Sequence, residues 1–382
     1  MSIYLDYNAS APIDNRVLDI MMDTYTNCYG NSDSRTHDYG DNARQMVEKA
    51  RKCVADLLNC ESSEVFFTSG ATESDNIAIL GLEKYGNQTN KKHIVTTSIE
   101  HKAVLESTRQ LSMRGFEVEY ISPDENGLIS SGEVLSSIRS DTLVVSIMHA
   151  NNETGVIQPV YEIGEELQER DILFHIDATQ SCGKLVEEVQ SLKYDLLSLT
   201  AHKMYGPQGV GALILKRIKH KLPPVQNIMF GGQQEHGIRP GTVPVALVAG
   251  FGEACRYSLR EYEHNNELCL EIKRGLISVL EDSGLDYSIN GAIEHTMPNT
   301  LNICVKGVAS EALMIATKQY CSISNGSACT SKDYSPSYVL KAMGMADEDI
   351  LSSIRISWGP KQDKKKVIDN FKQLVGIAEH MV

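Results

Sequence analysis

A lysine beyond an apolar run is the first residue in the sequence that could do chemistry. Lys203 follows the β-rich run Asp195–Leu199 and comes shortly before Gly206 and Pro207, which break the pattern. Desolvation lowers the pKa of a lysine and makes its neutral amine available for Schiff-base formation. An isolated loop lysine is otherwise usually a solvated surface charge.

An aspartate ends a second apolar run. Asp177 follows Ile172–Ile176, and a carboxylate in such a place is costly unless it is paired. One interpretation pairs Asp177 with the cationic ring nitrogen of a cofactor. The other makes it an ordinary helix-cap or turn aspartate.

A third run, Val65–Thr68, leads through Ser69 and Gly70 into a helical pattern. Small residues at such a junction leave backbone N–H groups and the helix dipole facing outward, which suits a phosphate. The alternative is an ordinary helix start capped by Thr72 or Ser74. Together, an anion site, a buried aspartate and a strand-end lysine are the groups that pyridoxal phosphate requires.

A cysteine in an unusual setting adds a nucleophile to these groups. Cys329 lies in the small, polar stretch Ser322–Ser331, which does not read as a core segment. A cysteine in such a stretch is expected to be accessible and able to ionise. Cys53 and Cys304, in apolar periodic stretches, read as structural.

These residues need a scaffold in which several strands end close together. Short apolar runs alternate with helical stretches over the first two thirds of the chain, which predicts an α/β fold with a mainly parallel sheet covered on both faces. The expected strands are Glu64–Thr68, His93–Thr97, Glu117–Ile121, Thr142–Met148, Ile172–Ile176, Asp195–Leu199 and Gly211–Leu215, with helices at Glu73–Tyr85, Lys102–Arg114 and Val160–Arg170. After about Gly250 a helical stretch from Glu253 to about Leu280 precedes the strand-like pieces Thr300–Val305 and Ser353–Ser357, which indicates a smaller α+β domain.

Composition narrows the function classes. The 382 residues carry a net charge of −14, which argues against direct binding of a nucleic-acid backbone. No apolar run approaches the roughly 18 residues of a membrane helix, and the first residues do not read as a signal peptide, so we expect a cytoplasmic protein. The nine cysteines are odd in number and never spaced C-x-x-C, so neither a zinc knuckle nor a full disulfide framework is indicated.

Six motifs of the sequence resemble those of a known enzyme family. The sequence is similar to the cysteine desulfurases, the pyridoxal-phosphate enzymes of iron–sulfur assembly and nitrogen fixation, from Tyr4 to Arg355. The motifs that carry the resemblance are Ala71–Asn76, Glu100–Val104, Asn151–Gly155, Asp177–Gln180, Ala201–Lys203 and Ser327–Ser331.

The resemblance implies a fold-type I homodimer. It assigns residues 11–250 to a large cofactor-binding domain, and residues 1–10 and 251–382 to a small domain that carries the Cys329 loop. Lys203 would hold pyridoxal phosphate as a Schiff base, and His101 would stack on its ring and relay protons. Asp177 would hold the pyridinium, while Asn152 and Gln180 would bond the ring substituents.

The resemblance also supplies the remaining roles. Ala71, Thr72, Thr200 and His202 would hold the phosphate, with Thr242 reaching it from the partner subunit. Thr200 stands where many relatives have serine, which keeps the hydroxyl. Arg355 and Asn152 would bind the substrate, Arg355 gripping its carboxylate as a bidentate fork. The alternative interpretation is that Arg355 is an ordinary surface arginine. The thiolate of Cys329 would then take the sulfur of L-cysteine as a persulfide and leave L-alanine.

The sulfur must go on to an acceptor protein. Housekeeping relatives continue beyond the position of Glu379–Val382 with a tail that docks the iron–sulfur scaffold, and this sequence does not. We therefore expect a dedicated acceptor, in iron–sulfur cluster assembly, tRNA thiolation or DNA phosphorothioation. Two alternatives stay open: a selenocysteine lyase or cysteine β-lyase of the same fold, and a non-catalytic assembly partner.

Overall fold

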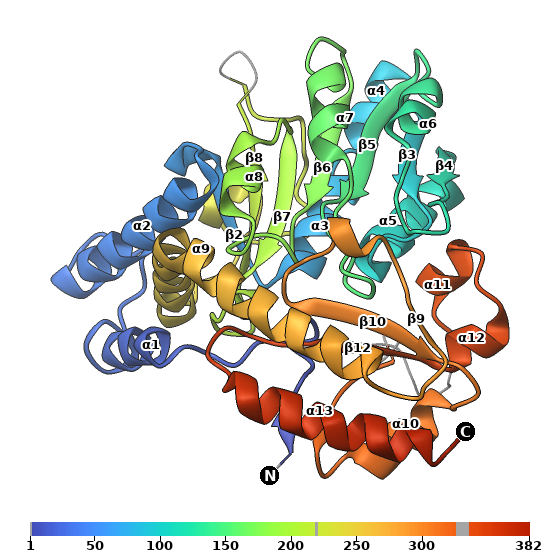
Figure 1. Ribbon diagram of the computed structural model, residues 1–382. Coiled ribbons are helices and arrows are strands. Elements are labelled where there is room, and N and C mark those ends of the chain that lie inside the picture. The colour runs from blue at the N-terminus through green and yellow to red at the C-terminus, as the bar shows by residue number, and fades with distance from the viewer. Residues whose placement is uncertain (1, 218–220, 326–335) are drawn as a thin grey trace.

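The structure, a computed structural model, describes residues 2–217, 221–325 and 336–382. Its largest feature is a seven-stranded sheet in the order β2-β8-β7-β6-β5-β3-β4 (Figure 1). The strands are β2 (Val65–Thr68), β3 (His93–Thr97), β4 (Glu117–Ile121), β5 (Thr142–Met148), β6 (Leu173–Asp177), β7 (Leu196–Thr200) and β8 (Gly211–Leu215).

Each strand of this sheet agrees with a predicted one to within a residue at either end. Neighbouring strands from β7 to β4 run parallel, whereas β8 lies antiparallel to both β2 and β7. The α/β prediction with a mainly parallel sheet is therefore confirmed, with β8 as the exception.

Alternate residues of the strands point to opposite faces of the sheet, and each face carries a hydrophobic core. Phe67, Ile176 and Leu199 pack on one face, under helices α2, α7, α8 and α9. Phe66 and Leu213 pack on the other, under α3 and α5. The helices are α2 (Asp38–Leu58), α3 (Ala71–Leu80), α5 (Lys102–Met113), α7 (Val160–Leu167), α8 (Val186–Ser191) and α9 (Val245–Glu281).

Two helix predictions need correction. The single helix expected over Glu73–Tyr85 is two helices, α3 and α4 (Glu83–Thr89), because the chain at Gly81 is held against another segment. The Gly81 carbonyl accepts from the N–H of Gln226, and a Cβ at Gly81 would collide with Val225 and Gln226. Helix α9 starts at Val245, eight residues before the predicted start, since its apolar first turns are buried against the large sheet.

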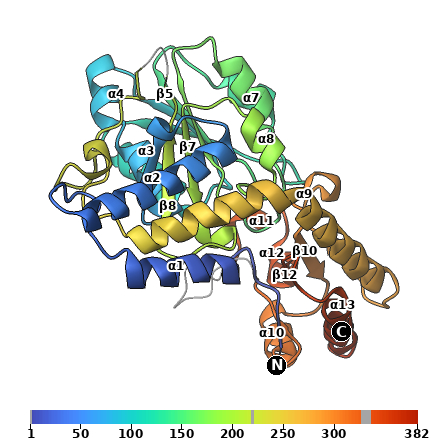
Figure 2. The ribbon, with the colours of Figure 1, turned by 90° about the vertical axis from the view of Figure 1, so that its left-hand side faces the viewer.

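A second, three-stranded antiparallel sheet lies beside the first, in the order β12-β10-β9. Its core contains Leu5, Trp358 and the C-terminal half of α9, which runs from the large sheet to the small one (Figure 2). The division into residues 11–250 and residues 1–10 with 251–382 stays a prediction. The remaining elements are β1 (Ile3–Tyr4), α1 (Asn15–Asn27), α6 (Ser131–Ser136), β9 (Tyr287–Ile289), β10 (Thr300–Val305), α10 (Ser310–Thr317), β11 (Cys321–Ser322), α11 (Tyr338–Ala342), α12 (Asp347–Leu351), β12 (Ser353–Ser357) and α13 (Lys364–Glu379).

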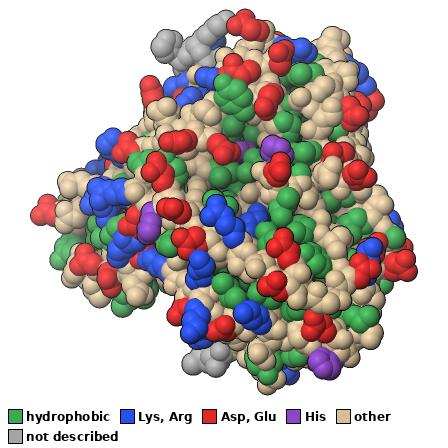
Figure 3. Space-filling view, viewed as in Figure 1, with side chains coloured by type: hydrophobic (Ala, Val, Ile, Leu, Met, Phe, Trp, Pro, Cys, Tyr) green, Lys and Arg blue, Asp and Glu red, His purple; other side chains and the backbone are tan. Residues whose placement is uncertain are grey.

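Charge is mixed on the face of the molecule that Figure 3 shows. On the face seen in Figure 3, lysine and arginine side chains lie among aspartate and glutamate side chains. Within the described residues, no helix is both long and apolar enough to span a membrane.

Candidate active site

Every predicted site residue except Thr242 and Cys329 lines a single cavity of about 420 Å³. A volume in this range suits a cofactor with a small substrate. The predicted residues around it are Ala71, Thr72, His101, Asn152, Asp177, Gln180, Thr200, His202, Lys203 and Arg355.

The start of α3 forms one end of the cavity. Gly70 is the N-cap, has φ 152°, and provides no side-chain acceptor for the helix start. The first N–H groups of α3, at Ala71 and Thr72, can therefore bind an anion with support from the helix dipole. The alternative of a Thr72 or Ser74 cap is wrong: the Ser74 hydroxyl lies 2.8 Å from the Thr68 hydroxyl instead.

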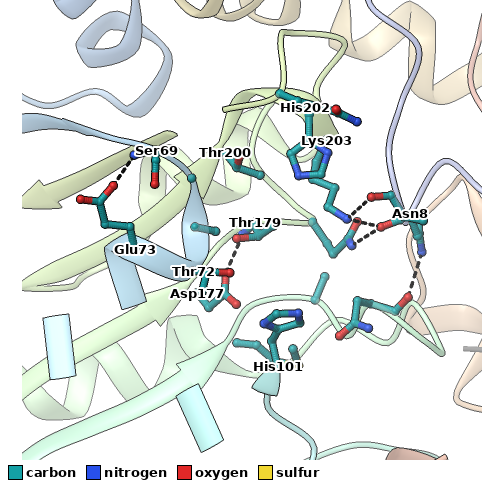
Figure 4. Close-up of a pocket in the computed structure, with 18 of the residues that line it drawn as sticks. Asn8, Ser69, Thr72, Glu73, His101, Asp177, Thr179, Thr200, His202 and Lys203 are labelled. Carbon is teal, nitrogen blue, oxygen red and sulfur yellow. Dashed lines mark hydrogen bonds between the residues drawn. The ribbon is translucent and has the colours of Figure 1, made fainter. Parts of the chain in front are cut away.

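Thr200 and His202 extend this anion-binding end (Figure 4). Thr200 ends β7, and His202 Nδ1 lies 3.2 Å from the hydroxyl of Ser10. Burial, together with the smaller effect of the charges of Lys203 and Lys184, lowers the pKa of His202 to about 4. His202 is therefore a neutral imidazole at physiological pH, able to donate or accept a hydrogen bond.

Asp177 is the last residue of β6 and is buried where the cavity begins. Its Oδ1 accepts the N–H of Thr179 at 2.9 Å, so the turn interpretation and the cavity interpretation both apply. Three further side-chain oxygens nearby are buried without a hydrogen-bond partner in the described part of the chain: Asn152 Oδ1, Thr179 Oγ1 and Gln180 Oε1. Unpaired buried polar atoms around one cavity fit a polar ring that would supply their partners.

Two more carboxyl groups lie buried behind Asp177. Burial and the charge of Asp177 raise the pKa of Asp75 well above its usual range. Burial also raises the pKa of Glu100 to about 8, although Thr97 and the N–H of Met148 donate to it. Glu100 is therefore largely protonated at neutral pH, and burial likewise favours the protonated form of Asp75. Of the three carboxyl groups, only Asp177 lines the cavity.

The raised pKa of Glu100 predicts a pH-dependent stability. A carboxyl whose pKa is higher in the folded state favours folding below its unfolded pKa, and this contribution is lost as the pH rises towards about 8. The melting temperature of Glu100→Gln relative to that of the wild type should therefore rise between pH 5 and pH 8.5, by on the order of 5 °C. Thermal unfolding at constant salt measures this, with exposed Glu133→Gln as the control; a constant difference would contradict it.

His101 lies across the cavity from His202 (Figure 4). It caps α5, and its Nδ1 accepts the N–H of Ala103 at 3.2 Å. Burial lowers the pKa of His101, although Asp177 acts in the opposite direction. The neutral ring therefore carries its proton on Nε2, where it can serve as donor or proton relay.

Lys203 reaches into the cavity from the short helical turn Ala201–Lys203 that follows β7. Its Nζ donates to the backbone carbonyls of Asn8 and Ala9, the latter at 2.7 Å. Gln180 Nε2 donates to the same Asn8 carbonyl at 3.1 Å. Lysine, glutamine and the N-terminal segment are thus held in one hydrogen-bonded group.

Arg355 closes the cavity from the small sheet and is 3 % exposed, so the surface interpretation is wrong. Its Nη2 pairs with Asp6 at 2.6 Å and its Nη1 donates to the Asn152 carbonyl at 2.9 Å. Nε is buried without a partner in the described residues. The guanidinium is therefore held in a fixed position at the edge of the cavity, with one buried donor unpaired in the described residues.

Asp6 and Asn8 are site residues to which the sequence interpretation gave no role. They come from the N-terminal segment, which pairs with β11 and β12 and so passes between the two sheets. The available signal was the alternation of polar Asp6 and Asn8 with Leu5 and Tyr7 just after the short strand β1.

Two predicted residues are not brought to the cavity. Thr242 is exposed and lies outside the cavity of its own chain. Cys329 lies outside the described residues. Their roles stay predictions.

Comparisons with known proteins agree on one family. The model of the aminotransferase class-V family matches residues 3–370. Cysteine desulfurase IscS of Vibrio cholerae serotype O1 (strain M66-2) is 45 % identical over 380 residues, covering 99 % of this chain and 93 % of the relative.

Solved structures give the same result. A NifS-like protein matches with a TM-score of 0.91 and 33 % identity over the full length of both chains. DndA from Streptomyces lividans matches with a TM-score of 0.82 and 40 % identity, covering 94 % of this chain and 99 % of that one.

Proposed function

The chain belongs to the aminotransferase class-V family and, within it, to the pyridoxal-phosphate-dependent cysteine desulfurases, and we propose that its cavity holds the cofactor at Lys203 and delivers sulfur to Cys329. The resemblance to cysteine desulfurases is confirmed. L-Cysteine is accordingly the substrate, and a sulfur acceptor is required. The lyase and non-catalytic alternatives are not favoured.

One observation carries the site assignment: an anion-binding helix start, a buried carboxylate and a lysine line the same cavity. These three groups match the phosphate, the ring nitrogen and the aldehyde of pyridoxal phosphate. The unpaired oxygens of Asn152, Thr179 and Gln180 provide partners for polar ring atoms. The residues present therefore fit the cofactor.

Each residue has a separate task. Asp177 would pair with the ring nitrogen, and His101 would stack on the ring, while Asn152 and Gln180 would bond its substituents. Lys203 Nζ would attach the cofactor and, once displaced by the substrate amine, remove the proton from the substrate Cα. When bound, pyridoxal phosphate supplies the electron sink for that bond breaking.

The phosphate would lie at the start of α3. Ala71 and Thr72 would donate backbone N–H groups, and Thr200 and His202 their side chains. Thr242 would reach the phosphate of a second copy, which makes the active enzyme a homodimer. The exposure of Thr242 supports this arrangement. Phe230, which lies with Thr242 on the connection between β8 and α9, is 89 % exposed, as expected of an apolar side chain that a second copy would cover.

Cys329 is the proposed sulfur carrier, and the other cysteines argue for it. Burial raises the pKa of each described cysteine thiol, so that a thiolate is disfavoured there, and none of these residues lines the cavity. The cysteines concerned are Cys28, Cys53, Cys60, Cys182, Cys255, Cys269, Cys304 and Cys321.

Sulfur transfer forms one bond and breaks another. The Cys329 thiolate attacks the substrate sulfur, so an S–S bond forms while the Cβ–S bond of the substrate breaks. The electron pair of the broken bond returns to carbon, and proton uptake at carbon yields L-alanine. The persulfide on Cys329 then passes its outer sulfur to an acceptor protein.

Arg355 is proposed to bind the substrate carboxylate, and this gives a testable change in KM. Arg355→Ala should raise the KM for L-cysteine by about 10- to 100-fold, because a charge-assisted hydrogen bond is lost. Arg355→Lys, which keeps the charge opposite Asp6, should lie between it and the wild type. Steady-state kinetics decide the matter, with exposed Arg170→Ala as the control; an unchanged KM for Arg355→Ala would exclude this role.

For the acceptor we propose a protein of iron–sulfur cluster assembly, tRNA thiolation or DNA phosphorothioation, a range that the similarity to IscS of Vibrio cholerae and to DndA supports. The test is to charge the holoenzyme with radioactive L-cysteine, remove the free amino acid, and offer one candidate acceptor from each system. Transfer to one acceptor identifies the pathway, whereas transfer to none of the three would contradict the proposal. The cytoplasmic location stays a prediction.

A further inference from the structure

The first turn of α11 rests on two segments that line the active-site cavity. Ser337 caps this helix: its Oγ accepts the N–H of Leu340 at 3.1 Å and donates to Glu153 at 2.5 Å. Tyr338 donates its hydroxyl to the carbonyl of Glu100 at 2.7 Å, directly before His101. The start of α11 is therefore tied to the His101 segment and to the loop around Asn152.

Glu153 is rigidly placed for this contact. It is 2 % exposed and follows Asn152, whose carbonyl accepts from Arg355. Asn151 Oδ1 accepts the N–H of Glu153 at 2.8 Å, and Asn302 donates to the Glu153 carbonyl at 3.1 Å. With its backbone fixed on both sides, Glu153 directs its carboxyl at Ser337.

The chain on the other side of residues 326–335 is tied to the same place. Ser324 and Arg355 exchange two backbone hydrogen bonds, of 3.2 Å and 2.6 Å. Because Arg355 in turn donates to Asn152, both ends of the stretch that carries Cys329 are connected to the loop containing Asn152 and Glu153.

A buried carboxyl at position 153 is energetically unfavourable by itself. Burial raises the pKa of Glu153, although Ser337, Arg355 and Lys102 act in the opposite direction. The neighbouring Val339 and Leu340 are buried in the large core and would hold α11 to the sheet by apolar packing alone. The carboxyl adds a directional bond that packing does not provide.

We propose that Glu153 is a positioning residue for sulfur transfer: through Ser337 it fixes where the chain that carries Cys329 rejoins the fold, relative to the substrate-binding Asn152 and Arg355. The inference rests on the proposed role of Cys329. A small displacement of a reacting group costs a large factor in rate, so the contact bears on kcat rather than on substrate binding.

The test uses cofactor-saturated enzyme and compares Glu153→Ala, Glu153→Gln, Ser337→Ala and the double alanine variant. Glu153→Ala and Ser337→Ala should each lower the kcat for alanine formation by about 10- to 100-fold, with the KM for L-cysteine within about twofold of wild type. Glu153→Gln keeps an acceptor for Ser337 and should restore most of kcat. The double variant should be no slower than the slower single one, because both remove the same contact.

Controls separate positioning from general stability and from failure of the proposed function. Ser130→Ala removes the serine cap of α6, which does not line the cavity, and should leave kcat unchanged. If Cys329→Ala still forms alanine, the proposed sulfur carrier is wrong and this inference falls with it. If Cys329→Ala is inactive but Glu153→Ala and Ser337→Ala keep wild-type kcat, or if Glu153→Gln is as slow as Glu153→Ala, only the positioning role is overturned.

Discussion

Cys329→Ala should abolish alanine formation from L-cysteine while leaving the bound cofactor intact. The substrate sulfur then has no thiolate to attack it, so the Cβ–S bond cannot break by sulfur transfer. We expect a loss of about 10³-fold or more in kcat. Cofactor absorbance, and its change on adding L-cysteine, should persist, because the described residues that line the cavity are untouched.

A matched cysteine gives the control. Cys28 is partly exposed and lies outside the cavity, so Cys28→Ala should keep wild-type kcat. Wild-type alanine formation by Cys329→Ala would exclude a persulfide on this residue. It would instead favour a lyase that releases sulfide directly.

Lys203→Ala should remove both the covalent attachment of the cofactor and the base that takes the substrate proton. Loss of the base alone is expected to lower kcat by about 10³-fold or more. Lys203→Arg should be equally inactive, because a guanidinium keeps the charge but cannot form the same attachment or release its proton. Alanine formation and the visible spectrum of the purified variants measure the two effects.

The control lysine lies at the other end of the same strand. Lys193 is exposed and precedes β7, so Lys193→Ala should match the wild type. A Lys203→Ala enzyme that retained wild-type kcat would refute the assignment of Lys203. An unchanged spectrum in that variant would place the cofactor elsewhere.

Much of the fold could be predicted because the strands have a recognisable sequence pattern. Fully buried parallel strands such as β5 and β6 need continuous apolar runs, and the adjoining turns need small and polar residues. The antiparallel β8 was not foreseen, because a buried strand has the same apolar pattern in either direction. The break between α3 and α4 depends on a contact between Gly81 and Gln226, which no local pattern carries.

The candidate site divides in the same way. Asp177, Lys203 and the glycine before α3 stand at strand ends, where the residue pattern itself indicates function. Most other roles came only with the family resemblance. Asp6 was missed because its partner is 349 residues away, and Glu153 because its contact with Ser337 spans 184 residues.

The central claim, that sulfur passes from L-cysteine to Cys329, is tested most directly by a single turnover. Holoenzyme is mixed with less than one equivalent of L-cysteine, without reductant or acceptor, and both alanine and the protein mass are measured. The account predicts one alanine per cysteine consumed and a mass increase of one sulfur atom on the peptide containing Cys329. Alanine without that added sulfur, or sulfur on another cysteine, would contradict it.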